Sequence, residues 1–239
     1  RQWLRDARPD VAVVFYNDHG LNFFLDKMPT FAIGAAPEYR NADEGWGIPQ
    51  VPAFRGEEDL SWHLIESLVA EDFDIVTCQE MKVDHALTLP FSLLWPDERW
   101  PVTVVPVCIN TVLFPLPSAR RCLALGRAVG RAVERWASDS RVLVIGSGGL
   151  SHQLEGQRAG HINKAFDLAF MDSLTKDPAW ATQYSINDLA REAGTQGIEL
   201  LNWLAARGAL ADGARELHRN YHIPISNTAA ATMLFETAT

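Results

Sequence analysis

The chain has 239 residues, of which 47% are hydrophobic and 21% are charged, and its formal net charge is −9 at pH 7. This composition is typical of a globular protein with a substantial core. The negative charge argues against a nucleic-acid partner, and no apolar run of the sequence is long enough to span a membrane. The three cysteines lack the spacing of a metal site, so we expect reduced core residues in a cytosolic, cytoplasmic protein.

Strand-like and helix-like segments alternate along the chain. The first ten residues resemble the end of a helix that stops at Pro9. This alternation predicts a single-domain α/β sandwich around a central, largely mixed β-sheet, with long loops at 37–57 and 85–101. From β-branched and aromatic content we expect strands at 11–16, 31–36, 73–78, 102–109, 141–147 and 227–235. From apolar residues at helical spacing we expect helices at 58–70, 118–137, 161–175, 186–193, 196–207 and 212–220.

Histidines follow three of the expected strands. The apolar strand at 11–16 runs into His19, the strand that ends at residue 78 is followed by His85, and the strand at 141–147 is followed by His152. In α/β folds, ligands collect at the carboxyl ends of strands. One histidine at such a place is usually a capping or core residue, but three with the same placement favour a functional site.

The segment GSGGLSHQ, at 146–153, is compatible with three functional interpretations. As a dinucleotide-binding fingerprint it lacks the last glycine, where Ser151 stands, and no acidic residue follows to bind a ribose. As a nucleophile elbow it lacks the final glycine, where Gln153 stands. The third interpretation makes His152 an acid/base group beside a tight glycine turn. The simpler alternative is a glycine-rich turn with a solvent-facing histidine.

A carboxylate in an apolar run suggests a metal site. Two histidines and one carboxylate can hold Fe(II) and leave three coordination positions open. His19 supplies one candidate ligand, and Glu199 lies among Ile198, Leu200 and Leu201, where a carboxylate is costly unless it is paired or metal-bound. Glu192 is the other candidate carboxylate. The residues alone also allow Glu199 to be an ordinary glutamate at a helix N-terminus, favoured by the helix dipole.

Several motifs together resemble one family over essentially the whole chain. They resemble the type II (class III) extradiol ring-cleaving dioxygenases, in particular the β subunit of protocatechuate 4,5-dioxygenase. Gallate and methylgallate dioxygenases share many of these motifs. The motifs are YNDH (16–19), PTFAIG (29–34), ADEGWG (42–47), VDH (83–85), GSGGLSHQL with RAG (146–160), EAGTQGIELLNWLAARGAL (192–210) and YHIPISNTA (221–229).

The resemblance implies a non-haem Fe(II) held by two histidines and one glutamate. It assigns His19 as one imidazole ligand and Glu199 as the carboxylate ligand. The other imidazole ligand of the family lies upstream, in a motif that residues 1–239 do not contain. We therefore expect residues 1–239 to be a catalytic domain that lacks its N-terminal strand and first metal ligand, with the absent strand as a neighbour of the strand at 11–16.

The resemblance also implies roles for four further residues. It assigns His152 as an acid/base group outside the metal's ligand set and His85 as a further active-site histidine, although the family usually has glycine at the position of Ala86. Asn17 and Ser226 match positions near the substrate.

The implied activity is Fe(II)-dependent meta cleavage of a catechol bearing a carboxylate, with insertion of both atoms of dioxygen. Protocatechuate is the expected substrate, and a small α subunit is the expected partner, in an α2β2 assembly. A gallate-type, methylgallate-type or aminophenol-type dioxygenase is the alternative within the class. A non-catalytic binding or regulatory subunit is the alternative outside it, and the presence of His19, His152 and Glu199 argues against that interpretation.

Overall fold

Strand β1 (Val11–Tyr16) lies inside the central sheet, and every one of its residues is buried. Its side chains alternate between two separate cores, with Val13 and Phe15 in one and Val14 and Tyr16 in the other. Such a strand has a continuous apolar sequence because neither of its faces meets water. The expected strand at this position is confirmed. The computed structural model describes residues 1–45, 47–97 and 100–237.

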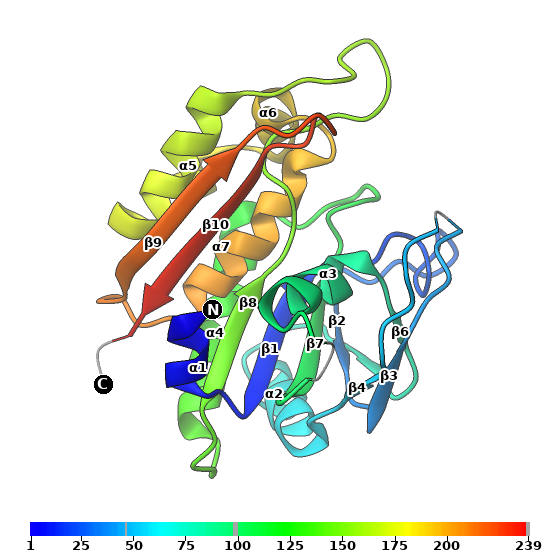
Figure 1. Ribbon diagram of the computed structural model, residues 1–239, viewed down its shortest axis with the longest axis vertical. Helices are drawn as coiled ribbons and strands as arrows, with labels where there is room; N and C mark the ends of the chain where they lie inside the picture. Colours follow the sequence, from blue (N-terminus) through cyan, green and yellow to red (C-terminus); the bar gives the residue numbers. More distant parts are fainter. Residues whose placement is uncertain (46, 98–99, 238–239) are drawn as a thin grey trace.

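Four further strands complete the central sheet, in the order β5-β2-β7-β1-β8. β1 runs parallel to both β7 and β8, and β2 runs parallel to β5, whereas β2 and β7 are antiparallel. The sheet is therefore mixed, and helices surround it, which confirms the predicted α/β class (Figure 1). The added strands are β2 (Phe31–Gly34), β5 (Val76–Cys78), β7 (Thr103–Ile109) and β8 (Val142–Gly146).

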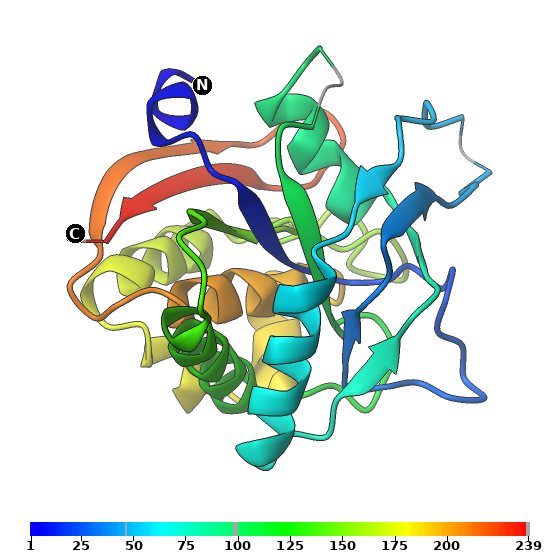
Figure 2. The ribbon, with the colours of Figure 1, turned by 90° about the horizontal axis from the view of Figure 1, so that it is seen from below.

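Helices α2, α4 and α7 pack together on one face of the sheet, and α3 lies on the other (Figure 2). No helix in the described parts of the chain is long and apolar enough to cross a membrane. The helices are α1 (Gln2–Ala7), α2 (Glu58–Ala70), α3 (His85–Leu94), α4 (Ala119–Arg135), α5 (Lys164–Lys176), α6 (Ile186–Ala193) and α7 (Leu200–Gly208), with 3-10 turns at Trp180–Gln183 and Gly197–Glu199. Two smaller sheets contain β3 (Glu38–Asn41), β4 (Phe54–Arg55), β6 (Lys82–Val83), β9 (Arg215–His222) and β10 (Ala230–Glu236).

The expected helix at 212–220 is wrong, because this part of the chain forms strand β9. β9 pairs antiparallel with β10, and Glu216 accepts a hydrogen bond from the Thr175 hydroxyl on helix α5 at 2.5 Å. Glutamate and leucine favour a helix locally, but the pairing with a strand farther along the chain overrides that preference.

The two segments expected to be long loops contain regular structure. Segment 37–57 includes β3 and β4, and segment 85–101 includes helix α3. Pro90 lies inside α3, where a proline removes a helical hydrogen bond and so hides the helix from sequence patterns. The buried side chains of Leu87 and Phe91 attach this helix to the second core. Trp46, Glu98 and Arg99, within these two segments, lie outside the described residues.

The expectation that an absent strand neighbours the strand at 11–16 is wrong. β1 pairs with β7 along its whole length, from Val11 opposite Thr103 to Tyr16 opposite Cys108, and it pairs with β8 on its other side. Both of its edges are therefore occupied within the described chain. The open edges of the sheet belong to β5 and β8, so any additional strand would join there.

A glycine in α4 allows this helix to approach α7, the helix that follows Glu199. A Cβ atom at Gly126 would lie 2.0 Å from the carbonyl oxygen of Ala205. Gly126→Ala is therefore expected to lower the free energy of unfolding by about 1–3 kcal/mol, because the helices must separate. Urea unfolding measures this change, and Gly213→Ala is the control, since no atom lies within 4 Å of its Cβ position. Equal stability of the two variants would contradict the close packing.

Candidate functional site

The chain after β1 bends around the carboxylate of Asp18. This carboxylate accepts hydrogen bonds from the backbone N–H groups of Gly20, Leu21, Asn22 and Phe23, at 3.0–3.2 Å. Gly20 has a φ of 79°, which glycine adopts without strain. The polar residues that interrupt the apolar strand therefore build a fixed turn at the strand's carboxyl end.

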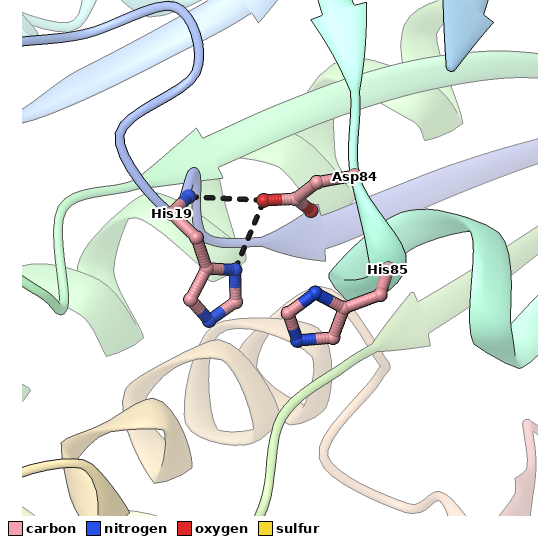
Figure 3. A group of neighbouring side chains, drawn as sticks. All are labelled: His19, Asp84 and His85. Carbon is pink, nitrogen blue, oxygen red and sulfur yellow. Dashed lines mark hydrogen bonds and ion pairs between the residues drawn. The ribbon is translucent and has the colours of Figure 1, made fainter. Parts of the chain in front are cut away.

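Asp84 fixes both the backbone and the ring of His19. Oδ2 of Asp84 accepts a hydrogen bond from the backbone N–H of His19 and lies 2.9 Å from its ring atom Nδ1. Oδ1 of the same carboxylate caps helix α3 by accepting from the N–H of Ala86 at 3.0 Å. Figure 3 shows that Nε2 of His19 consequently lies on the side away from Asp84. A carboxylate behind an imidazole in this way fixes its orientation and makes it a better ligand.

The carboxylate of Glu199 lies beside Nε2 of His19, the ring nitrogen that Asp84 does not bind. Its Oε1 atom lies 3.5 Å from Nε2 of His19, and its Oε2 atom accepts from the N–H of Gly149 at 2.6 Å. The side chain is only 13% exposed. A Cβ atom at Gly148, whose φ is 139°, would lie 2.6 Å from the Cβ of Glu199. The glycine-rich turn is thus needed for the carboxylate to fit.

His152 lies on the other side of the same turn and is buried. Its Nδ1 atom donates to the carbonyl of Leu150 at 2.8 Å, which leaves Nε2 as the atom that can accept a proton. A Cβ atom at Gly149 would lie 2.9 Å from the His152 ring, so a side chain at this position would crowd the imidazole. The interpretation of a solvent-facing histidine does not hold.

His85 is the first residue of α3, and its ring stacks on that of His19. The ring centroids are 4.3 Å apart, with 25° between the planes. Its Nδ1 atom lies 2.5 Å from Oε2 of Glu44. Ligand atoms of His19, Asp84 and His85 lie within 4.8 Å of one another, which makes this group a second arrangement that could hold a metal ion.

The electrostatics of the site favour a positive charge between the carboxylates. Burial lowers the pKa of His19, but the hydrogen bonds to Asp84 and Glu199 outweigh it and raise the pKa to about 10. Burial raises the pKa of Glu199, but its hydrogen bond with His19 and the neighbouring His152 bring the net pKa below its usual value. Asp84 and Glu199, which both face the imidazole of His19, therefore stabilise a positive charge on it.

Asn17 joins this group, whereas Ser226 does not. Nδ2 of Asn17 donates to Oε1 of Glu199 at 3.4 Å and lies 3.2 Å from Nε2 of His19. Ser226 is exposed in the turn between β9 and β10. The structure places Thr228, two residues farther on, opposite His152 in an isolated β-bridge. Ser226 thus lies two residues from Thr228 but is not itself joined to the site by a described contact.

A residue that supports Asn17 and a residue that supports the glycine-rich turn were missed from the sequence. Asn202 is fully buried and donates to Oδ1 of Asn17 at 3.0 Å and to the carbonyl of Ser147 at 2.9 Å. Its position three residues after Glu199, on the same helical face of an apolar run, is a signal that could have found it. Asp167, on α5, accepts from both the N–H and the hydroxyl of Ser151. No local pattern marks Asp167, because its partner lies 16 residues away.

The sequence matches a family of ring-opening enzymes. Residues 1–231 match the family described as "Catalytic LigB subunit of aromatic ring-opening dioxygenase". A relative described as gallate dioxygenase, from Pseudomonas putida, is 38% identical over 196 residues, which cover 82% of this chain and 57% of that protein. The chain therefore spans little more than half the length of this relative.

A second relative and a solved structure are also similar to this chain. A relative from Paraburkholderia xenovorans, described as 2,3-dihydroxyphenylpropionate/2,3-dihydroxicinnamic acid 1,2-dioxygenase, is 33% identical over 272 aligned positions, covering 94% of this chain and 83% of that protein. The crystal structure of an uncharacterized protein from Escherichia coli K12 has the same fold, with a TM-score of 0.59 at 15% identity, covering 98% of this chain and 90% of that one. The chain belongs to the family of the catalytic LigB subunit of aromatic ring-opening dioxygenases.

Proposed function

We propose that this protein is an Fe(II)-dependent extradiol dioxygenase that opens the ring of a catechol bearing a carboxylate. Both atoms of dioxygen enter the product. The observation that carries this proposal is the approach of Nε2 of His19 to Oε1 of Glu199, at 3.5 Å, in a site that favours positive charge. Membership in a family of ring-opening dioxygenases supports the reaction class.

The residues fit a divalent metal. Two donor atoms that each bond one metal at about 2 Å must lie within about 4 Å of each other, and the two atoms of His19 and Glu199 meet this condition. Imidazole and carboxylate together suit Fe(II), and Asp84 behind His19 provides the outer support that such a ligand needs. When bound, the metal would act as a Lewis acid and a template for the diol and dioxygen.

His152 and His85 are proposed to move protons. The Nδ1 proton of His152 is engaged by the carbonyl of Leu150, so Nε2 can take a proton from a substrate hydroxyl and return it later in the reaction. His85 has the same arrangement, with Nδ1 bound by Glu44. Asn17, whose amide contacts both His19 and Glu199, is proposed to orient the substrate beside them.

We propose protocatechuate as the substrate, because the motifs of the chain resemble those of the protocatechuate 4,5-dioxygenase β subunit. Gallate is the second candidate, since the relative described as gallate dioxygenase is 38% identical. A small α subunit is the proposed partner, in an α2β2 assembly. The resemblance to the protocatechuate 4,5-dioxygenase β subunit supports this partner.

We further propose that a second imidazole ligand precedes residue 1, as the resemblance implies. A strand carrying it would join the sheet at β8, whose five residues are only half-buried at the open edge. The alternative ligand is His85, whose ring stacks on that of His19.

Glu199→Gln in the full-length protein is expected to abolish iron retention, because a neutral amide is a poor ligand for a hard cation. Iron content after anaerobic loading and desalting measures this effect. Glu192→Gln is the matched control, since the carboxylate of Glu192 accepts a hydrogen bond from the side chain of Asn163 and is not a proposed metal ligand. Iron content of Glu199→Gln equal to that of the wild type would contradict the assignment.

His152→Phe is expected to keep iron and bind the catechol, but to lower kcat by roughly 10²–10⁴-fold, because the acid/base group is lost. Steady-state oxygen uptake measures kcat, and iron content is measured on the same samples. His161→Phe is the control, since the ring of His161, in the following loop, binds the backbone carbonyl of Glu192 and not a residue proposed for the site. A kcat of His152→Phe within about threefold of the wild type would rule out the acid/base role.

Residues 1–239 alone are expected to bind Fe(II) weakly, because one ligand of the set is absent. A version extended by roughly 40 upstream residues, enough for a strand and its connections, should hold one iron per chain and consume oxygen with protocatechuate when the α partner is present. Iron content and oxygen uptake are compared for both versions, with gallate as a second substrate. Equal iron content and activity would place the remaining ligand within this chain and point to His85. Faster oxygen uptake with gallate than with protocatechuate would show that gallate, and not protocatechuate, is the preferred substrate.

A further inference from the structure

We propose that Glu44 is the positioning residue of His85. By accepting a hydrogen bond from Nδ1–H of this histidine, it keeps the proton of the neutral imidazole on Nδ1 and leaves the Nε2 lone pair free toward the site. This inference rests on the proposed function for its catalytic consequence. Its structural core, the tautomer of His85, can be tested without any activity.

Glu44 binds His85 through both carboxylate oxygens. Oε2 lies 2.5 Å from the ring atom Nδ1, and Oε1 accepts from the backbone N–H at 2.7 Å. The Glu44 side chain is only 8% exposed, although it belongs to a loop. Since a carboxylate offers only acceptors, Nδ1 of His85 must carry the proton in this contact. The bond made by one ring nitrogen decides the state of the other.

The loop that carries Glu44 is closed at its base. Asn41 donates through Nδ2 to the carbonyl of Val51 at 2.9 Å and accepts from the N–H of Val51 at 3.1 Å. Gln50 donates to the carbonyl of Ala42 at 3.1 Å. These hydrogen bonds join the start of the loop, at the end of strand β3, to its last residues. The carboxylate is therefore presented to His85 from a fixed position.

Helix capping does not account for this contact. The first turn of α3 is already capped by Asp84, whose Oδ1 accepts from the N–H of Ala86. Glu44 adds a bond to the N–H of His85, but its shorter contact is with the ring. A helix cap needs only a bond to a backbone N–H group, so capping does not explain the contact of Glu44 with the imidazole ring.

His19 and His85 form a stacked pair in which each ring has its own carboxylate. Asp84 binds Nδ1 of His19, and Glu44 binds Nδ1 of His85. Figure 3 shows that the two Nε2 atoms lie on the same side, away from Asp84. Glu44 therefore fixes the ring of His85 in the way that Asp84 fixes the ring of His19. One imidazole can then bind the metal while the other exchanges a proton with the substrate.

The first arm of the test records the ring ¹⁵N signals of His85 in the metal-free protein at one fixed pH. The wild type is expected to show the Nδ1–H tautomer. Glu44→Ala is expected to shift His85 toward the Nε2–H form, which is the usual preference of a free imidazole. Glu38→Ala is the matched control, because Glu38 lies on strand β3 and its carboxylate pairs with the exposed Arg40. An unchanged tautomer in Glu44→Ala would overturn the proposal.

The second arm measures kcat, KM and iron content of the same variants in the full-length protein. Glu44→Ala is expected to lower kcat at least about tenfold, with KM and iron content changed less than about threefold, since a wrong tautomer removes proton transfer rather than binding. A lowered kcat without a tautomer change, or a tautomer change without a lowered kcat, would overturn the role. If the wild type turns over no diol, the proposed function fails, and the ¹⁵N arm alone still decides whether Glu44 sets the tautomer.

Discussion

The burial of the Glu199 carboxylate beside His19 is the interaction on which the rest of the site depends. A buried carboxylate is costly unless a positive charge or several hydrogen-bond donors accompany it. Here Gly149 donates to one oxygen and Asn17 to the other, and the imidazole of His19 lies beside them. In this arrangement the pKa of His19 is raised to about 10. The carboxylates around His19 thus stabilise a positive charge at this place.

The fold brings these groups together from distant parts of the chain. β1 ends at the turn that carries His19, and α7 begins directly after Glu199. The turn between β8 and His152 contains glycines because a side chain at Gly148 would overlap Glu199. Asn202 then joins α7 to Asn17 at the end of β1. The parallel pairing of β1 with β8, in which Phe15 lies opposite Gly146, explains why residues 131 positions apart in sequence reach the same end of the sheet.

Some of this arrangement could be predicted from sequence, because its signals are local. The apolar strand at 11–16 can be recognised from its own residues, and Glu199 stands out because its neighbours in sequence are apolar. Strand β9 could not be predicted, because its pairing with β10 outweighs its helical composition. Glu44 was missed for a similar reason, since its partner lies 41 residues away. The neighbour of β1 was wrongly expected because burial shows that a strand is interior but not which strands flank it.

Anomalous diffraction from crystals of the full-length protein, loaded anaerobically with Fe(II), tests the central claim most directly. The account predicts one iron peak at bonding distance, about 2 Å, from both Nε2 of His19 and Oε1 of Glu199. Asp84 should remain bound to Nδ1 of His19, on the side of the ring opposite the metal. A peak among His19, Asp84 and His85 without Glu199, or a fully loaded protein with no peak at Glu199, would contradict it.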